Sequence, residues 1–247
     1  MNKTATLDKM QTMKMHGMAR AYRDTYEVGV KNGLTPDEVI SFLVDAEWDE
    51  RYNRRLARLI AKAGFRYRAR IEEIDCDPSR KIDKNKIQRF ADIDWIRNAE
   101  NIIITGPTGA GKSFISNAIG HQACVNGFSV MYFNCLKFFS VLKIAKADGS
   151  YPKAVKKIKS SHLLILDDFG ISSFDRDSRL MLLEIIEDRI GLSSTIIATQ
   201  LPIESWFDVI GDRTIADAIV DRLIHSSHKF FVEGDSMRKK FWKIPAT

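Results

Sequence analysis

The sequence has few cysteines and no long apolar segment, and both absences narrow its class. Its 247 residues include three cysteines, Cys76, Cys124 and Cys135, which lie far apart and lack metal-ligand spacing. They indicate free thiols in a reducing compartment. The segment from Met1 to Lys14 lacks the apolar core of a signal peptide, and no run approaches 18 apolar residues. The sequence, which has no internal repeat or low-complexity segment, therefore predicts a cytoplasmic protein without a membrane span.

Positive charge is concentrated in two parts of the chain. The formal net charge is +6, residues 1–70 hold 14 Lys/Arg against nine Asp/Glu, and residues 143–159 hold six Lys against one Asp. Two basic regions favour a polyanionic partner such as nucleic acid. Charge alone leaves open a solvated lysine-rich surface that has no partner.

A strand, a glycine-rich turn and a helix in succession predict a phosphate-binding loop. Three isoleucines and Thr105, at 102–105, precede Gly-Pro-Thr-Gly-Ala-Gly-Lys-Ser. The glycines let successive backbone N–H groups point at phosphate oxygens, and the following helix adds its positive end. Lys112 is expected to reach the β- and γ-phosphates of ATP, and the Ser113 hydroxyl to ligate Mg²⁺. The predicted nucleotide-binding residues are Gly106, Pro107, Thr108, Gly109, Ala110, Gly111, Lys112 and Ser113.

Two carboxylates follow a second apolar run, about 50 residues after the loop. Residues 163–166 are Leu-Leu-Ile-Leu, and Asp167 and Asp168 come next. A buried strand delivers such acids at its carboxyl end, where α/β sheets bind ligands. Asp167 is expected to hold magnesium, directly or through water, and Asp168 to orient and deprotonate the attacking water. The structural alternative is a strand that ends in an acidic turn.

Strands and helices alternate from residue 99 onward, which predicts an α/β fold with a parallel sheet of five strands covered by helices on both faces. The expected strands are 101–105, 129–133, 163–167, 195–199 and 228–232. The expected helices are 112–127, 135–147, 152–160, 176–190, 203–210 and 213–225.

The part before the sheet is predicted to be helical. Residues 6–31 show a partly helical apolar spacing, and Thr35 with Glu38 forms a capping box that begins a second helix reaching Gly64. We therefore expect a small all-α domain at 1–65 that contacts DNA, a partner or other subunits. Residues 66–98 form a charged connector without a catalytic signal, and residues 99–247 form the ATPase domain.

Three motifs together resemble the AAA+ ATPases. They are the loop at 106–113, Leu-Leu-Ile-Leu-Asp-Asp-Phe-Gly at 163–170 and Thr-Ile-Ile-Ala-Thr-Gln-Leu-Pro at 195–202. The sequence from 195 through 221–223 to 234–240 is similar to that of the IstB proteins. These are the transposition helper ATPases of bacterial insertion sequences, in the DnaC/IstB branch of the AAA+ ATPases. The resemblance covers residues 5 to 245. It implies the AAA+ P-loop fold and Mg²⁺-dependent ATP hydrolysis.

The resemblance also implies roles for residues outside the loop. Thr199 or Gln200 corresponds to sensor I, near the γ-phosphate and the water. Arg222 resembles the arginine finger that completes a neighbour's site, with Arg213 as a second candidate. Arg238 resembles sensor II, and its alternative role is a surface ion pair. The chain has Asp168 where most AAA+ proteins have Glu, which implies slow hydrolysis until a partner adjusts the site.

An arginine finger between subunits implies a head-to-tail ring or helical filament bridged by ATP. In relatives, the region between the second strand and the acidic motif faces the central channel and contacts duplex DNA. Lysines there suit phosphate contacts, so binding is expected to be weakly sequence-specific and salt-sensitive. The predicted DNA-binding lysines are Lys143, Lys146, Lys153, Lys156, Lys157 and Lys159.

The favoured function is a DNA-remodelling ATPase that assembles on duplex DNA, selects or deforms a target and recruits or stimulates a transposase. The alternative hypothesis is a DnaC-like replicative helicase loader, which would have the same ATPase chemistry but would act on a helicase. A P-loop small-molecule kinase is the third hypothesis. It would need a lid with arginines and a phosphoacceptor pocket, whereas the sequence has a sensor-like strand and basic stretches.

Overall fold

The computed structural model describes residues 3–28, 34–234 and 236–237. The chain divides into two compact units, Met1–Arg58 and Leu59–Thr247. Each unit is described by itself below.

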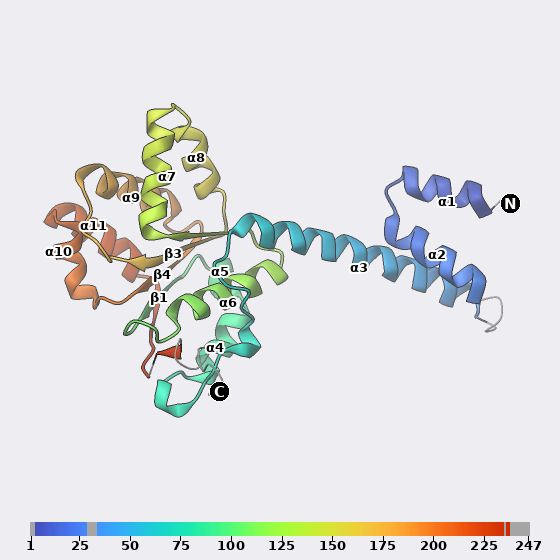
Figure 1. The fold of residues 1–247 in the computed structure, drawn as a ribbon, viewed down its shortest axis with the longest axis horizontal. Helices are drawn as coiled ribbons and strands as arrows, with labels where there is room; N and C mark the ends of the chain where they lie inside the picture. Colours follow the sequence, from blue (N-terminus) through green and yellow to red (C-terminus); the bar gives the residue numbers. More distant parts are fainter. Residues whose placement is uncertain (1–2, 29–33, 235, 238–247) are drawn as a thin grey trace, which may run out of the picture. The chain divides into compact units, whose positions relative to one another are not determined.

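The first unit is helical, as Figure 1 shows. The expected single helix over 6–31 is wrong, because the chain breaks where Lys14 adopts a left-handed φ of 58°. The predicted capping box is confirmed: the Glu38 carboxylate accepts from the Thr35 N–H at 2.7 Å, and the Glu38 N–H donates to the Thr35 hydroxyl. The helices are α1 (Lys3–Thr12), α2 (His16–Val28) and α3 (Pro36–Ala63), which ends in the second unit.

The second unit alternates strands with helices. Its strands are β1 (Asn101–Thr105), β2 (Val130–Asn134), β3 (Leu163–Phe169), β4 (Ser194–Thr199) and β5 (Ser227–Phe231). Its α-helices are α4 (Lys84–Ala91), α5 (Asp94–Arg97), α6 (Lys112–Val125), α7 (Cys135–Ala147), α8 (Tyr151–Lys159), α9 (Arg176–Arg189), α10 (Trp206–Ile210) and α11 (Arg213–Ile224). Short 3₁₀ helices are η2 (Ile71–Glu73), η3 (Pro78–Arg80) and η4 (Ile203–Ser205). Within the described ranges, no helix has both the length and the apolarity needed to cross a membrane.

The strands described form one parallel sheet in the order β2-β3-β4-β1-β5, which confirms the predicted fold class. In the centre, Ile103 of β1 pairs with Ile197 of β4, and Leu166 of β3 also pairs with Ile197. All strands run in the same direction, so their carboxyl ends share one edge of the sheet. That edge receives the phosphate-binding loop and the two aspartates.

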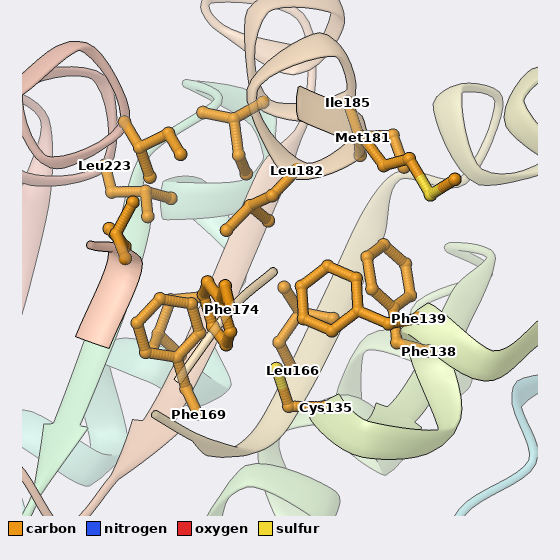
Figure 2. Packing of buried hydrophobic residues seen from close by; sticks show 14 of the residues in the cluster. Cys135, Phe138, Phe139, Leu166, Phe169, Phe174, Met181, Leu182, Ile185 and Leu223 are labelled. Carbon is orange, nitrogen blue, oxygen red and sulfur yellow. The ribbon is translucent and has the colours of Figure 1, made fainter. Parts of the chain in front are cut away.

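Alternation along β3 assigns its side chains to two faces. Ile165 lies on the face covered by α6, where its Cδ1 approaches Gly120. Leu164 and Leu166 lie on the other face, in a core shared with α7, α9 and α11. Figure 2 shows Leu166 in this core near a cluster of aromatic rings that includes Phe138, Phe139, Phe169 and Phe174. Burying each such side chain contributes about 1.5–3 kcal/mol.

The segment expected to be a connector packs within the second unit. Phe90, Ile93, Trp95 and Ile96 are buried, and the Trp95 indole N–H donates to the Phe90 carbonyl at 3.1 Å. The Lys86 ammonium also donates to the Lys229 carbonyl of β5 at 2.9 Å. Residues after Arg58 therefore belong to the same compact body as the sheet, because this segment carries its own apolar anchors.

The core predicts a clear order of thiol reactivity. Cys124 and Cys135 are at most 2% exposed, and burial raises the pKa of each thiol to about 12, whereas Cys76 is half-buried. Because the thiolate is the nucleophile, we expect an alkylating reagent at pH 8 to modify Cys76 alone in the native protein and all three in urea. Mass spectrometry of partly labelled protein measures this. Equal native labelling of Cys124 would contradict the packing of α6.

Candidate functional site

The loop between β1 and α6 is shaped by glycines that no other residue can replace without strain. A Cβ on Gly106 would lie 2.2 Å from the carbonyl oxygen of Val232. Gly111 has a φ of 97°, and a Cβ there would lie 2.9 Å from Nη2 of Arg80. The Lys112 ammonium is buried and donates to the carbonyls of Gly106 and Pro107, both at 2.8 Å. The loop thus holds a cation above backbone N–H groups at the start of a helix, which is a site for phosphate.

Asp167 is the buried carboxylate next to this loop. It is 1% exposed, and its Oδ1 accepts from the Ser113 hydroxyl at 2.9 Å. Its Oδ2 accepts from the Tyr132 hydroxyl of β2 at 2.7 Å. Burial raises the pKa of Asp167, while the hydrogen bonds from Tyr132 and Ser113 favour its charged form. Alternation along β3 explains the contact, because Asp167 shares the face of Ile165, toward α6.

Asp168 departs from the regular strand. The pairing of β3 with β4 shifts register between Leu166 and Phe169, and Asp168 has a left-handed φ of 55°. Its Oδ2 accepts from the Asn134 amide at 2.8 Å and lies 3.6 Å from Nη1 of Arg66. This irregularity lets two consecutive aspartates serve the same site, where regular alternation would turn them to opposite faces.

Beside these groups lies a cavity of about 470 Å³, a volume suited to a small molecule or cofactor. It is lined by the loop and by Asp168, Gln200 and residues of the former connector. The lining residues are Tyr67, Glu73, Ile74, Asp75, Arg80, Thr108, Gly109, Gly111, Lys112, Ser113, Phe114, Ile115, Asp168, Gln200 and Met237.

Comparison with known proteins identifies the family of this chain. The sequence profile of the family described as IstB-like ATP binding protein matches residues 8–243. The chain belongs to the IstB-like ATP-binding protein family. It is 39% identical over 234 residues to the insertion sequence ATP-binding protein y4pL of Sinorhizobium fredii, covering 95% of this chain and 96% of that protein. It is 37% identical to the insertion sequence IS1162 ATP-binding protein of Pseudomonas fluorescens, covering 80% and 86%.

Solved structures support the AAA+ fold of this IstB-like chain. The DnaC helicase loader superposes with a TM-score of 0.54 at 17% sequence identity, covering 67% of this chain and 97% of that one. At that identity the likeness concerns the fold.

The two sensor I candidates occupy different places in the IstB-like structure. Gln200 lines the cavity, and its side-chain oxygen accepts from the Thr108 hydroxyl at 2.6 Å. Thr199 is fully buried, donates to the Phe169 carbonyl at 2.7 Å and accepts from the Leu201 N–H. Alternation puts Thr199 on the core face of Ile197, away from the loop. Of these two candidates, Gln200 lines the cavity and Thr199 does not.

Of the predicted arginines, Arg222 and Arg213 do not line this cavity. Arg222 is half-buried, and its guanidinium donates to Glu187 and to the Ala218 carbonyl, both at 2.8 Å. Arg213 is exposed at the first position of α11. Arg238 lies outside the described residues. The first two sit at opposite ends of one helix, so a nucleotide bound in a neighbouring subunit would meet them in different ways.

Half of the predicted DNA-binding lysines form ion pairs with acids in and beside α9. Lys143 pairs with Asp175 at 2.5 Å and lowers the pKa of that carboxyl. Lys146 pairs with Asp177, and Lys159 pairs with Asp188. Lys153, Lys156 and Lys157 are exposed on α8, and no ion pair joins them to the described residues. Among these six lysines, those without an ion pair to the described residues therefore all lie on α8.

Several site residues escaped the sequence analysis. Asn134 could have been found, since it ends β2 and the carboxyl ends of parallel strands meet at one edge. Arg80 gave no signal, because it lies in the segment read as a connector. It is 5% exposed, and its Nη2 donates to the Ala110 carbonyl at 2.5 Å. Its Nε is buried and has no hydrogen-bond partner within the described structure.

The residues present fit a magnesium nucleotide. Ser113 Oγ and Asp167 Oδ1 lie 2.9 Å apart, so two oxygens suited to Mg²⁺ are already adjacent beside the loop. Burial of Asp167 without a cation is costly, and a divalent ion would compensate its charge. Lys112 can exchange two carbonyl contacts for phosphate oxygens.

The geometry predicts that substitutions of Thr199 and Gln200 lower the free energy of unfolding by different amounts. Replacing Thr199 with Val leaves the Phe169 carbonyl and the Leu201 N–H unpaired, and we expect a loss of about 1–3 kcal/mol in the free energy of unfolding. Gln200→Ala, at an exposed residue, should change it by about 0.5 kcal/mol or less. Urea unfolding followed by circular dichroism measures both. The reverse order would contradict the assignment of Gln200 to the cavity.

Proposed function

We propose that this chain is an ATP-dependent, DNA-binding ATPase that assembles on duplex DNA and assists transposition by recruiting or stimulating a transposase. The observation that carries the proposal is the convergence of Lys112, Ser113, Asp168 and Gln200 on one cavity at the carboxyl edge of a parallel sheet. The names of the curated relatives supply the context of insertion sequences and of ATP binding.

In this proposal the chain's own residues supply positioning and charge. Lys112 and the loop N–H groups hold the β- and γ-phosphates, and Ser113 with Asp167 holds Mg²⁺, which neutralises phosphate charge when bound. Asp168 accepts a proton from the attacking water, and Gln200 orients that water beside the γ-phosphate. The reaction takes place beneath the loop, away from bulk water. Electrostatic interactions between these charged groups and the phosphates are stronger there than in water.

DNA binding is proposed to use the free charge of α8. The ion pairs of Lys143, Lys146 and Lys159 reduce their attraction for phosphate. Lys153, Lys156 and Lys157 remain for backbone contacts, which give affinity without reading sequence.

Assembly is proposed to join subunits head to tail through the nucleotide, in a ring or a helical filament. The trans-acting arginine is Arg222 or Arg213. Arg222 would have to leave Glu187, whereas Arg213 is exposed at the start of α11. The family match favours this function over a helicase loader, whose likeness to this chain is one of fold.

The central test combines turnover with particle size. We expect duplex DNA to stimulate ATP hydrolysis, and ATP to convert the protein into large assemblies seen by light scattering. Lys112→Ala should weaken ATP binding about 10- to 100-fold, because charge-assisted hydrogen bonds to phosphate are lost. It should also fail to assemble. Tight ATP binding by that variant would refute the role of Lys112.

A protein that stays monomeric with a non-hydrolysable ATP analogue and duplex DNA would overturn the assembly. The transposase step is tested by integration of labelled transposon ends into target DNA, with and without this protein and ATP. Integration that is equal in both reactions would overturn the proposed assistance.

The lysine assignment predicts a contrast between two double variants. Lys156→Ala with Lys157→Ala should lower DNA affinity for all sequences and reduce the slope of log affinity against log salt by about 2, at about 0.9 per phosphate contact. The matched control, Lys146→Ala with Asp177→Ala, removes an exposed ion pair and leaves the net charge unchanged. Fluorescence anisotropy at several salt concentrations measures both. A larger loss of DNA affinity in the control would indicate that the DNA contact lies on α7 and not on α8.

A further inference from the structure

We infer that Arg66 is a positioning residue that orients Asp168 for ATP hydrolysis. The inference rests on the proposed function of Asp168. Nη1 of Arg66 lies 3.6 Å from Oδ2 of Asp168, the same oxygen that accepts from Asn134. The Asn134 amide therefore donates a hydrogen bond to the same carboxylate oxygen that the Arg66 guanidinium attracts at ion-pair distance, and both contacts restrain a side chain that lines the cavity.

A strained backbone explains why Asp168 needs such support. Its left-handed φ of 55° follows a register shift in β3, so the strand does not define its side-chain direction as it does for Leu166. A general base must lie within hydrogen-bond reach of its water, and a small misplacement lowers the rate strongly. Contacts from outside β3 have to supply that direction.

The segment that carries Arg66 is itself firmly seated on α6. The backbone N–H groups of Arg66 and Tyr67 both donate to Oδ1 of Asn117, at 2.9 and 3.2 Å. Asn117 is fully buried and donates to the Ser113 carbonyl at 2.6 Å. The side chain of Phe65 lies against Gly120, where any Cβ would approach its ring to 2.7 Å. The position of Arg66 is thus tied to the helix that begins with Lys112.

Arg66 does not line the nucleotide cavity, whereas its neighbour Tyr67 does. A role in nucleotide binding and a role in positioning Asp168 therefore make different predictions. Loss of Arg66 should affect turnover and leave nucleotide affinity almost unchanged. Because its side chain is 43% exposed, solvent screening limits the effect to a moderate one.

The test compares Arg66→Ala, Arg66→Lys and Arg68→Ala in the full chain with duplex DNA. Arg66→Ala should lower kcat about three- to tenfold, while KM and the Kd of a non-hydrolysable ATP analogue change less than twofold. Arg66→Lys should recover most of kcat, since an ammonium can hold the same oxygen. Arg68, exposed in the same segment, should tolerate Ala. Unchanged kcat in Arg66→Ala, a raised KM with unchanged kcat, or a Lys variant as slow as Ala would overturn the inference.

A double-mutant cycle separates this inference from the proposed function. Urea midpoints are measured for Arg66→Ala, Asp168→Asn and the double variant. We expect the Arg66→Ala shift to shrink in the Asp168→Asn background, and additive shifts would overturn the pairing. If the wild-type protein hydrolyses no ATP, the proposed function fails, and the cycle still decides whether Arg66 holds Asp168.

Discussion

The buried carboxylate of Asp167 is the group on which the rest of the site depends. It joins three parts of the fold, because it accepts from Ser113 at the start of α6 and from Tyr132 on β2 while belonging to β3. A buried charge is tolerated only when hydrogen bonds or a cation compensate it, and bonds to a charged group contribute about 1.5–3 kcal/mol each. The parallel sheet makes this possible by bringing the ends of its strands to one edge.

The second aspartate, Asp168, is held at the same edge of the sheet in a different way. Asp168 leaves the strand geometry and is held by Asn134 and Arg66, which come from other elements. Asn134 also caps α7, where its side-chain oxygen accepts from the Leu136 N–H at 3.1 Å. One short side chain therefore connects a helix start to the Asp168 carboxylate. The site is built from strand ends and helix starts, whose unpaired backbone groups suit phosphate and carboxylate alike.

Fewer lysines on the helices beyond the sheet lack an ion pair than the composition implies. Residues 143–159 are rich in lysine, yet three of these lysines neutralise aspartates in and beside α9 and so tie α7 and α8 to it. Exposed ion pairs of this kind contribute little stability each, about 0–1 kcal/mol. Among the six lysines of residues 143–159, those without an ion pair to the described residues are therefore the three exposed on α8.

The sequence by itself determined the alternation of strands and helices, the phosphate-binding loop and the position of the acids after β3. These features are encoded locally, by apolar runs, glycines and caps such as Thr35 with Glu38. It missed the break at Lys14, because that turn has no glycine or proline to mark it. Only the tertiary structure decided that Gln200 faces the cavity and Thr199 the core, and that Tyr132, Asn134 and Arg66 hold the aspartates. Those contacts join residues 34 to 102 positions apart, and no local pattern specifies which distant side chain fills the space beside a strand end.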